Sequence, residues 1–386
     1  AALPAAVPRD GYGGRVMRDQ PGNLPLHHWP SHGGQAAALL QRFGLPADHP
    51  LEDISANLNP LGPPGWVTGY LAQRLAGLGR YPEPDYRAAR QAIAEHAGVE
   101  PGQVLLTNGG AEAIFLAAAH HAGQQALIVT PTFGEYARAC NAHGVRISEL
   151  GLLPGTFDPP AAALLQAAAS ADVVFVCRPN NPTGTLLPVA LIEALLDALK
   201  PGASLVVDEA FIDLALEAAP LTPLLQRYPA LILLRSMTKF FTLPGLRLGY
   251  VLADEGRIAQ LQAQQPPWSV NHLAAELVPP LLADEGFARR THQWLAREQP
   301  RMGAALAALG LEVVPSHSCF HLVRPGAAQR QRGISSIVLL ERLLHQGMLA
   351  RHTHGFAGLK GGWLRLALRD GVTNDRLSKV LNDCLC

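Results

Sequence analysis

The sequence of 386 residues predicts an α/β protein in which helices flank a mostly parallel sheet and a smaller α+β domain packs beside it. Between about residues 100 and 255, short apolar runs alternate with segments of helical periodicity, as in βαβ units. The runs are apolar at successive positions, which is typical of parallel strands buried on both faces. After residue 285 mixed helices accompany two other strand-like runs, "CFHLV" (319–323) and "WLRLAL" (363–368).

The same change of pattern predicts the domain organisation. Residues 1–30 are rich in Pro, Gly and Arg and lack the apolar core of a signal peptide, so we expect a loose N-terminal arm. Residues 61–284 are predicted to form the large domain, and 31–60 with 285–386 the small one. Composition changes little between 256 and 300, so it does not fix the boundary.

Charge and hydropathy favour a small-molecule ligand. Lys+Arg and Asp+Glu both number 31, and no block of like charge indicates a nucleic acid or an anionic membrane as partner. Apolar runs such as 203–207 and 231–234 are far shorter than the roughly 20 residues that span a bilayer. The apolar content of 48% is enough for a packed core without disulfides.

The cysteines indicate reduced thiols in a cytoplasmic protein, since they are few, odd in number and scattered. They are Cys140, Cys177, Cys319, Cys384 and Cys386. The last two could bind a metal ion, but no His or Cys cluster accompanies them in the sequence. We therefore expect no metal site.

Three strands are predicted in the middle of the chain, at "ADVVFVC" (171–177), "ASLVVD" (203–208) and "ALILLR" (230–235). Pro188 can begin the helix between the first two. One face of that helix is apolar, at Leu191, Ile192, Leu195, Leu196 and Leu199. The loops that follow the strands are "RPNNPTG", "DEAF" and "SMTK".

Ligands of parallel sheets bind beyond the carboxyl ends of the strands. We therefore expect Asn181, Asp208 and Lys239 to face one crevice. A fourth run, "QVLLTN" (103–108), precedes Gly109-Gly110 and an Ala-rich helix, whose free N–H groups could cradle a phosphate. A Gly-Gly pair before a helix is more often only a turn.

A lysine, a buried carboxylate and a phosphate cradle together predict pyridoxal phosphate as cofactor. Lys239 would join the cofactor's aldehyde, and Asp208 would keep its pyridine nitrogen protonated. Asn181 could donate to the phenolic oxygen. The phosphate would bind the arginine of the "LPGLRLG" stretch and two hydroxyls of "SMTK", namely Arg247, Ser236 and Thr238.

Each feature has a simpler interpretation when it stands alone. Asp208-Glu209 could cap a helix, Asn180-Asn181-Pro182 could be a turn, and Lys239 could be a solvated side chain. Four such features in chain order, each after a predicted strand, favour a site.

Four motifs resemble those of fold-type I pyridoxal-phosphate enzymes, in the subgroup that contains histidinol-phosphate aminotransferase. They are "RYPEPDY", "PNNPTG", "DEAF" and "SMTKFFTLPGLRLGY", and the resemblance covers nearly the whole chain from about residue 30. It implies the fold-type I transferase fold, Lys239 as the lysine that holds the cofactor, Asp208 as the pyridine partner and Asn181 as the phenolic-oxygen donor. It also implies a stacking role for Phe133 on the cofactor ring.

The resemblance further implies a phosphate clamp and a homodimer. The clamp consists of Ser236, Thr238, Arg247 and the backbone of Gly110 and Ala111. A tyrosine in "RYPEP", Tyr81, matches one that reaches the phosphate of the neighbouring subunit. Many relatives have tyrosine where this chain has Phe211, so one hydrogen bond to the phenolic oxygen is absent.

Three more stretches resemble the threonine-phosphate decarboxylases of cobalamin biosynthesis: "HGG" (32–34), "ISANLNPLGPP" (54–64) and "PPWSVNHLA" (266–274). This resemblance implies decarboxylation of L-threonine O-3-phosphate to (R)-1-amino-2-propanol O-2-phosphate and carbon dioxide. Two alternatives stay open: a histidinol-phosphate or related aminotransferase, and a non-catalytic ligand-binding module on the same fold.

The resemblance places four residues beside Asn181 around the substrate: His32, Asn57, Arg351 and Arg365, the last matching an arginine that binds substrate carboxylate. By itself, His32 could be one surface histidine among 15, and Arg351 could belong to a solvated basic turn. The sequence does not assign which donor binds phosphate and which binds carboxylate.

Overall fold

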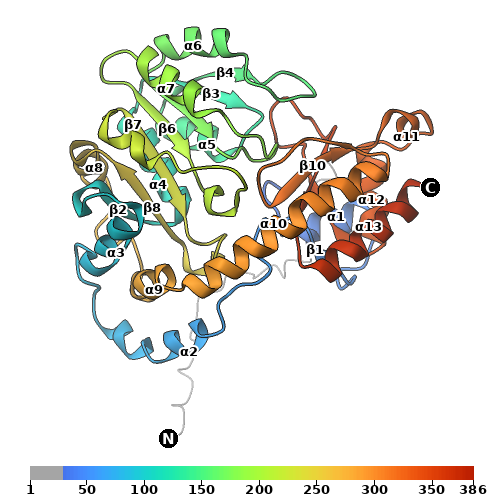
Figure 1. Ribbon diagram of the computed structural model, residues 1–386, viewed down its shortest axis with the longest axis horizontal. Coiled ribbons are helices and arrows are strands. Elements are labelled where there is room, and N and C mark those ends of the chain that lie inside the picture. Colours follow the sequence, from blue (N-terminus) through green and yellow to red (C-terminus); the bar gives the residue numbers. More distant parts are fainter. Residues whose placement is uncertain (1–28) are drawn as a thin grey trace, which may run out of the picture.

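A seven-stranded sheet lies at the centre of the larger part of the molecule in the computed structural model, which describes residues 29–386 (Figure 1). The strand order is β2-β8-β7-β6-β5-β3-β4, and β8 is antiparallel to both of its neighbours. The strands are β2 (Val104–Asn108), β3 (Gln125–Thr130), β4 (Arg146–Gly151), β5 (Val173–Cys177), β6 (Ser204–Asp208), β7 (Leu231–Ser236) and β8 (Leu248–Ala253). The predicted mostly parallel sheet is confirmed, and β8 is the exception that the sequence pattern did not reveal.

Side chains of each central strand alternate between two hydrophobic clusters, one on each face of the sheet. In β5, Val173 and Phe175 pack on one face, whereas Val174 and Val176 pack on the other. This is why the strand is apolar at every position. The first face is covered by α4 (Gly109–His120), α5 (Glu135–Ala142) and α8 (Glu255–Gln262). The second is covered by α3 (Arg87–Ala97), α6 (Ala161–Ser170), α7 (Val189–Ala198) and α9 (His272–Leu282).

A smaller antiparallel sheet, of order β12-β13-β10-β9, lies to one side of the large sheet (Figure 1). Its strands are β9 (Glu312–Val313), β10 (Phe320–Arg324), β12 (Arg351–His352) and β13 (Leu364–Ala367). The two strand-like runs predicted near the C-terminus are thus β10 and β13. Helices near it are α1 (Ala36–Arg42), α11 (Ala327–Gln331), α12 (Ser336–His345) and α13 (Gly371–Leu385).

Segments from both ends of the chain meet in this smaller part. β1 (Glu52–Asp53) pairs in parallel with β11 (Met348–Leu349), so residues near 50 are joined to residues near 350. The 24-residue helix α10 (Glu285–Ala308) extends from α9 toward this part, and Asp284 caps it by accepting from Phe287 N–H. α2 (Val67–Ala72) lies at the lower edge of the molecule in Figure 1. The domain boundaries at 61 and 285 stay predictions, and residues 1–28 of the predicted arm lie outside the described residues.

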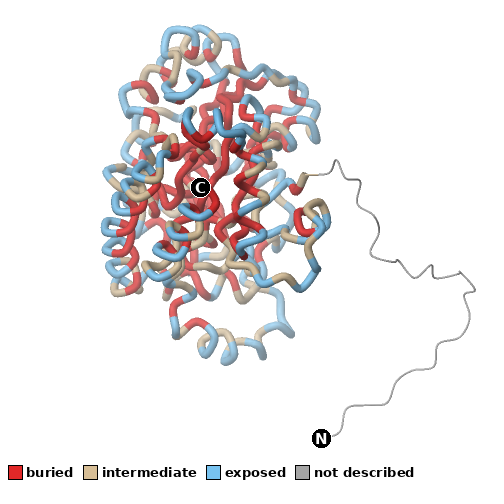
Figure 2. The backbone as a smooth tube through the Cα atoms, turned by 90° about the vertical axis from the view of Figure 1, so that its right-hand side faces the viewer, coloured by how far each residue is buried: buried red, intermediate tan, exposed pale blue. Residues whose placement is uncertain are grey.

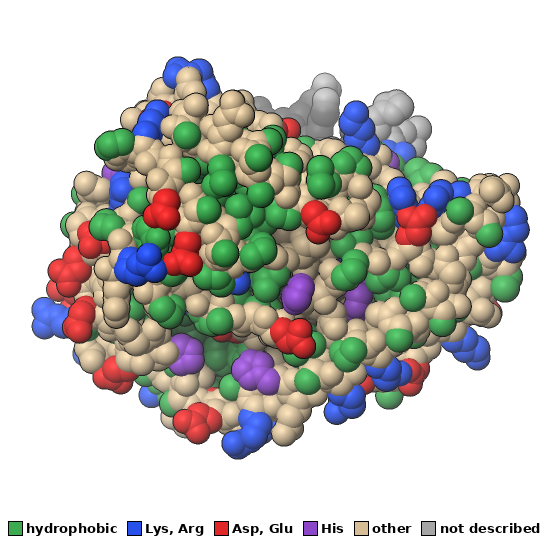
Figure 3. All heavy atoms as spheres, turned by 45° about the horizontal axis from the view of Figure 1, so that its top comes forward, with side chains coloured by type: hydrophobic (Ala, Val, Ile, Leu, Met, Phe, Trp, Pro, Cys, Tyr) green, Lys and Arg blue, Asp and Glu red, His purple; other side chains and the backbone are tan. Residues whose placement is uncertain are grey.

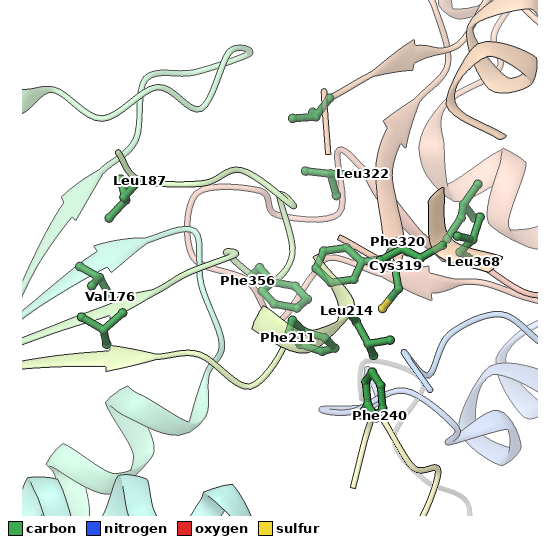
Figure 4. Packing of buried hydrophobic residues seen from close by; sticks show 14 of the residues in the cluster. Val176, Leu187, Phe211, Leu214, Phe240, Cys319, Phe320, Leu322, Phe356 and Leu368 are labelled. Carbon is green, nitrogen blue, oxygen red and sulfur yellow. The ribbon is translucent and has the colours of Figure 1, made fainter. Parts of the chain in front are cut away.

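One hydrophobic cluster extends from the large sheet into the smaller one, so the two parts share a core. Phe211, in the loop after β6, packs edge-on against Phe320 of β10 at 5.2 Å between ring centres. Figure 4 shows these two rings and Phe356 close together where the parts meet. Buried backbone accordingly runs through the centre of the molecule in Figure 2. This shared core fixes the carboxyl edge of the large sheet against the smaller part.

Charged side chains of both signs are interspersed on the face shown in Figure 3, and neither sign forms an extended patch there. Within residues 29–386, no helix is both long and apolar enough to cross a bilayer.

A buried ion pair lies on the side of the sheet away from α4. Arg235 Nε donates to Glu209 Oε1 at 3.1 Å, and the two side chains are 6% and 0% exposed. The other carboxylate oxygen of Glu209 accepts from Leu221 N–H at 3.0 Å. Arg235 also donates to Thr222 Oγ1. Because both charges are out of water, each depends on the other.

We predict that Glu209→Gln lowers the free energy of unfolding by about 3 kcal/mol, because it removes the buried carboxylate that Arg235 contacts at 3.1 Å and leaves only that of Asp213, at 3.8 Å. Urea unfolding of the cofactor-free protein, followed by tryptophan fluorescence, measures the change. The control is Glu193→Gln, which removes an exposed pair with Arg227 and should cost less than about 1 kcal/mol. Equal effects of the two substitutions would contradict the prediction.

Candidate active site

The carboxyl ends of β2, β5, β6 and β7 meet at one edge of the sheet, because β8 reverses direction between β2 and β7. Two adjoining pockets open there, one of about 110 Å³ against the strand ends and one of about 950 Å³ between the two parts of the molecule. The residues that line both pockets are Phe133, Asn181, Phe211, Thr238, Lys239 and Arg247. The predicted crevice therefore exists at the predicted edge.

Lys239 lies three residues after the end of β7 and lines both pockets. It is half-buried, whereas the other three lysines of the chain are exposed. Its ammonium lies 5.3 Å from the ring centre of Phe211. Burial lowers the pKa of Lys239, and the neighbouring charge of Asp208 opposes this. A lysine in such surroundings can supply a neutral amine near physiological pH more readily than a solvated one.

Asp208 ends β6 and is buried, with both carboxylate oxygens engaged. Oδ1 accepts from Ala210 N–H at 2.9 Å, and Oδ2 accepts from the hydroxyl of Tyr136 at 2.6 Å. Burial raises the pKa of Asp208, while the bond from Tyr136 and the charge of Lys239 lower it. The carboxylate thus lines the inner pocket with hydrogen bonds that favour its ionised form.

Asn181 is buried in the loop after β5, and Arg365 of β13 donates to its Oδ1 at 2.5 Å. This bond leaves the amide N–H₂ of Asn181 as the group free to donate elsewhere. The neighbouring Asn180 bonds Thr132 and the carbonyl of Pro131, in the loop that carries Phe133. The two loops are therefore fixed to each other.

The opposite end of the inner pocket has the donors of an anion site. Gly110 and Ala111 lie in the first turn of α4, whose N–H groups are free to bind a ligand. The hydroxyls of Ser236 and Thr238 lie 2.8 Å apart, and the exposed Arg247 completes the lining. A phosphate group would find hydroxyl, amide and guanidinium donors here.

Two glycines allow this close approach of backbone to ligand. Gly109 has a φ of +75°, and a Cβ there would lie 2.8 Å from Nη2 of Arg247. A Cβ on Gly249 of β8 would lie 2.7 Å from the carbonyl carbon of Gly109. The space beside the start of α4 therefore depends on the absence of side chains.

Arg351 and Arg365 occupy directly opposed positions of β12 and β13, and both are buried and line the larger pocket. Neither makes an ion pair with a carboxylate among residues 29–386. Burial lowers the pKa of Arg351 to about 10 and that of Arg365 to about 9, the latter with a contribution from Arg351. Both remain cationic at neutral pH. Like charges opposed on adjacent strands are destabilising, so this pair favours an anionic ligand.

A short segment at residues 29–34, here called the strap, runs along the rim of the larger pocket. Arg351 donates to the carbonyls of Pro30 and Ser31 at 2.9 and 2.7 Å. The Trp29 ring stacks on His354 at 3.7 Å, and the guanidinium of Arg42 lies 3.9 Å from the same ring. These contacts join the strap to the smaller part.

The strap carries His32 across the rim to the larger part. His32 Nε2 lies 3.1 Å from Oε1 of Glu135, in the first turn of α5, and both residues line the larger pocket. Gly33 is tightly placed, since a Cβ there would lie 2.3 Å from the carbonyl oxygen of Ser55. Asn57 also lines this pocket, and its buried Oδ1 has no hydrogen-bond partner among the described residues.

Tyr81 lies apart from the site in this single chain. It is 79% exposed, stacks on Trp268 at 4.5 Å between ring centres, and lines neither pocket. A contact of Tyr81 with a second subunit stays a prediction. Leu75 and Leu78 are also exposed.

The comparisons with known proteins agree with this geometry. The model of the "Aminotransferase class I and II" family matches residues 57–383. The chain belongs to this family. Its members use pyridoxal 5′-phosphate, so the protein is a pyridoxal-phosphate-dependent enzyme of the fold-type I class.

Three relatives illustrate where the chain lies within the family. Threonine-phosphate decarboxylase of Salmonella typhimurium is 37% identical over 92% of this chain and 96% of its own length. The crystal structure of L-threonine-O-3-phosphate decarboxylase from Porphyromonas gingivalis has a TM-score of 0.75 at 26% identity, covering 86% of this chain and 98% of that one. The structure of histidinol-phosphate aminotransferase from Clostridium acetobutylicum has a TM-score of 0.80 at 26% identity and the same two coverages. The predicted resemblance to both groups is confirmed.

The inner pocket fits the cofactor chemically. Its anion end, kept open by Gly109 and Gly249, suits the phosphate, and Asp208 suits a protonated pyridine nitrogen. Phe133 and Lys239 line the same pocket, where Phe133 could cover one face of the ring and Lys239 could join the aldehyde. These assignments of individual residues stay predictions. No group of three or more His, Cys, Asp or Glu side chains within residues 29–386 could hold a metal ion.

Sequence reasoning missed three residues of the site. Tyr136 donates a hydrogen bond to Asp208, Asn180 joins two loops, and Glu135 pairs with His32. The sequence indicates Asn180 only as part of a turn. Tyr136 follows Phe133 by three residues, but Phe133 precedes α5, so helical spacing gives no signal for the contact between them.

We predict that Lys239 is the point of covalent attachment of the cofactor. Borohydride treatment of the purified holoenzyme, followed by peptide mapping, should locate the cofactor on Lys239. Lys239→Ala should retain cofactor by its phosphate contacts, release it on gel filtration in denaturant, and lose turnover. Lys200→Ala, which removes an exposed lysine, serves as control. Attachment at another lysine, or full activity of Lys239→Ala, would refute the assignment.

Proposed function

We propose that the protein is a homodimeric threonine-phosphate decarboxylase of the cytoplasm, which acts in cobalamin biosynthesis. It would convert L-threonine O-3-phosphate to (R)-1-amino-2-propanol O-2-phosphate and carbon dioxide. The relatives from Salmonella typhimurium and Porphyromonas gingivalis support this proposal by their names and by coverage of nearly their whole length. Residues 61–284 would be the cofactor-binding domain.

The single observation that carries the proposal is the buried pair of Arg351 and Arg365 without a carboxylate partner in the described part of the chain. Two cations opposed in this way favour a substrate with more than one anionic group. Threonine phosphate has two anionic groups: a carboxylate on Cα and a phosphate on the side-chain oxygen of Cβ. His32 and Asn57, which line the same pocket, would add two further polar contacts.

Within the site, each residue would have a defined task. Bound pyridoxal phosphate supplies an electron sink for the pair released when the bond from Cα to the carboxylate breaks. Asp208, which lines the inner pocket, would hold the proton on the pyridine nitrogen, and Asn181, whose Oδ1 accepts from Arg365, would donate its amide N–H to the phenolic oxygen. Lys239 Nζ can deliver the proton that replaces carbon dioxide at Cα. Lys239 lines both the smaller and the larger pocket, so its amine could act on cofactor and substrate alike.

Orientation distinguishes decarboxylation from transamination. The bond that breaks is the one held perpendicular to the cofactor plane, so a decarboxylase must place the carboxylate there instead of the Cα hydrogen. Contacts to substrate groups remote from Cα can fix the angle between the scissile bond and the cofactor plane. The binding energy of these contacts then raises the turnover rate as well as the affinity. Arg351, which donates to the strap carbonyls, and His32, which pairs with Glu135, would hold the remote phosphate in this proposal.

Histidinol-phosphate aminotransferase is the second candidate. It is supported by the TM-score of 0.80 to the Clostridium acetobutylicum protein. That activity also needs a phosphate site and a carboxylate site for the second substrate, glutamate or 2-oxoglutarate, which gives or accepts the amino group. It differs in requiring glutamate or 2-oxoglutarate and in leaving the amino group on the cofactor.

The test uses purified holoenzyme with L-threonine O-3-phosphate, L-threonine, or histidinol phosphate plus 2-oxoglutarate. We expect carbon dioxide and a phosphorylated amino alcohol from the first substrate. With L-threonine, turnover at saturation should fall as well as affinity, because the phosphate orients the scissile bond. Formation of glutamate from the third mixture, without carbon dioxide from the first, would favour the aminotransferase.

Variants of two arginines complete this test. Arg351→Ala should lower kcat/KM for threonine phosphate about tenfold to a hundredfold, the effect of one lost charge-assisted hydrogen bond at a buried site. Arg42→Ala is the matched control, because Arg42 packs on Trp29 of the strap but lines neither pocket. Equal losses in both variants would show that Arg351 acts only by holding the strap. If the wild-type enzyme turned over threonine and threonine phosphate at the same rate at saturation, the phosphate would contribute to substrate affinity but not to orientation of the scissile bond.

The proposed dimer predicts complementation between two damaged subunits. If Tyr81 reaches the partner's cofactor phosphate, a mixed dimer of Tyr81→Ala and Lys239→Ala has one site with both residues intact. Each variant by itself should have little activity, and unfolding and refolding them together should restore it. A mixture as inactive as its components, at a dimeric mass by light scattering, would place Tyr81 outside the partner's site.

A further inference from the structure

Tyr136 is buried between the two groups that are expected to hold the cofactor ring. Its side chain is 0% exposed, and its hydroxyl donates to Asp208 Oδ2 at 2.6 Å. Its ring lies edge-on to Phe133, at 5.9 Å between ring centres and an interplanar angle of 82°. The other face is filled by Phe175 of β5, at 5.6 Å and 16°. Tyr136 therefore contacts both the carboxylate and the aromatic ring of the proposed cofactor site.

The sheet explains how this contact arises. Val206 of β6 packs in the cluster beneath α4 and α5, and Asp208, two residues later, continues on the same face. Tyr136 belongs to the second position of α5 and is part of that cluster. The carboxylate and the phenol are thus brought together by strand alternation and by the packing of α5.

We propose that Tyr136 is a positioning residue for the cofactor: its hydroxyl keeps the carboxylate of Asp208 ionised, and its ring holds Phe133 in place for stacking. The proposal rests on the proposed placement of the cofactor against Asp208, but not on the identity of the substrate. Asp208 is out of water, and an unpaired carboxylate there would favour its protonated form. The charge of Lys239 and the N–H of Ala210 are the other groups that stabilise the anion.

The phenol is suited to a permanent donor role. Burial, together with the charge of Asp208, raises the pKa of Tyr136 well above its ordinary value, so the hydroxyl keeps its proton. An acceptor-only group at this position would repel the carboxylate. With the phenol in place, the second lone pair of Oδ2 and that of Oδ1 remain for the pyridine N–H.

The test compares Tyr136→Phe with wild type and with Tyr86→Phe, a control that removes a phenol bonded to the carbonyl of Val270 outside the site. Cofactor labelled with ¹⁵N at the pyridine nitrogen reports its protonation by NMR, and equilibrium binding to the cofactor-free protein reports affinity. In Tyr136→Phe the resonance should move toward the unprotonated form, as it should in Asp208→Asn. The dissociation constant for the cofactor should rise about tenfold.

Incorporation of 3,5-difluorotyrosine at position 136 gives a second variant that is nearly isosteric with tyrosine. It allows the test to be made even if Tyr136→Phe does not fold. Its more acidic hydroxyl is a stronger donor, so the nitrogen should stay protonated to higher pH than in wild type. A resonance and dissociation constant in both Tyr136 variants equal to those of wild type would overturn the proposal. These readouts need no substrate, so failure of the decarboxylase assay leaves them unaffected.

Discussion

A carboxylate removed from water at the end of β6 is the constraint on which the rest of the site depends. An ionised Asp208 is unfavourable in a buried position unless donors and a cation surround it, and the fold supplies Tyr136, Ala210 N–H and Lys239. Each comes from a different element, so the charge is stable only when α5, the loop after β6 and the segment after β7 are all in place. The site and the fold are therefore energetically linked.

The smaller part of the molecule has the opposite electrostatic character. It brings two buried arginines, Arg351 and Arg365, to the crevice without a carboxylate partner in the described chain. Arg365 nevertheless bonds Asn181 in the larger part, and Arg351 bonds the strap that carries His32 to Glu135. Both arginines thus take part in contacts that join the two parts of the molecule.

Alternation along single strands decides which charges serve the site and which serve stability. Asp208 and Glu209 are adjacent in sequence, yet the first meets Tyr136 on the α5 side, whereas the second pairs with Arg235 on the other side. The sequence analysis located the acidic pair and predicted a role for Asp208, but it had no partner for Glu209. Strand pairing, which is a non-local property, supplied Arg235. The same holds for β8, whose antiparallel course depends on pairing with β2 and β7.

The sequence by itself located β2, β5, β6, β7, β10 and β13, and the motifs that carry Lys239, Asp208, Asn181 and the expected phosphate cradle, because apolar runs and turn residues are local signals. It also predicted the family, which the comparisons confirm. Only the tertiary structure decided that Tyr136 bonds Asp208, that Arg351 opposes Arg365, and that the strap crosses the pocket rim. These contacts join residues from 14 to 321 positions apart, and their free energy comes from burial and pairing that no local pattern encodes.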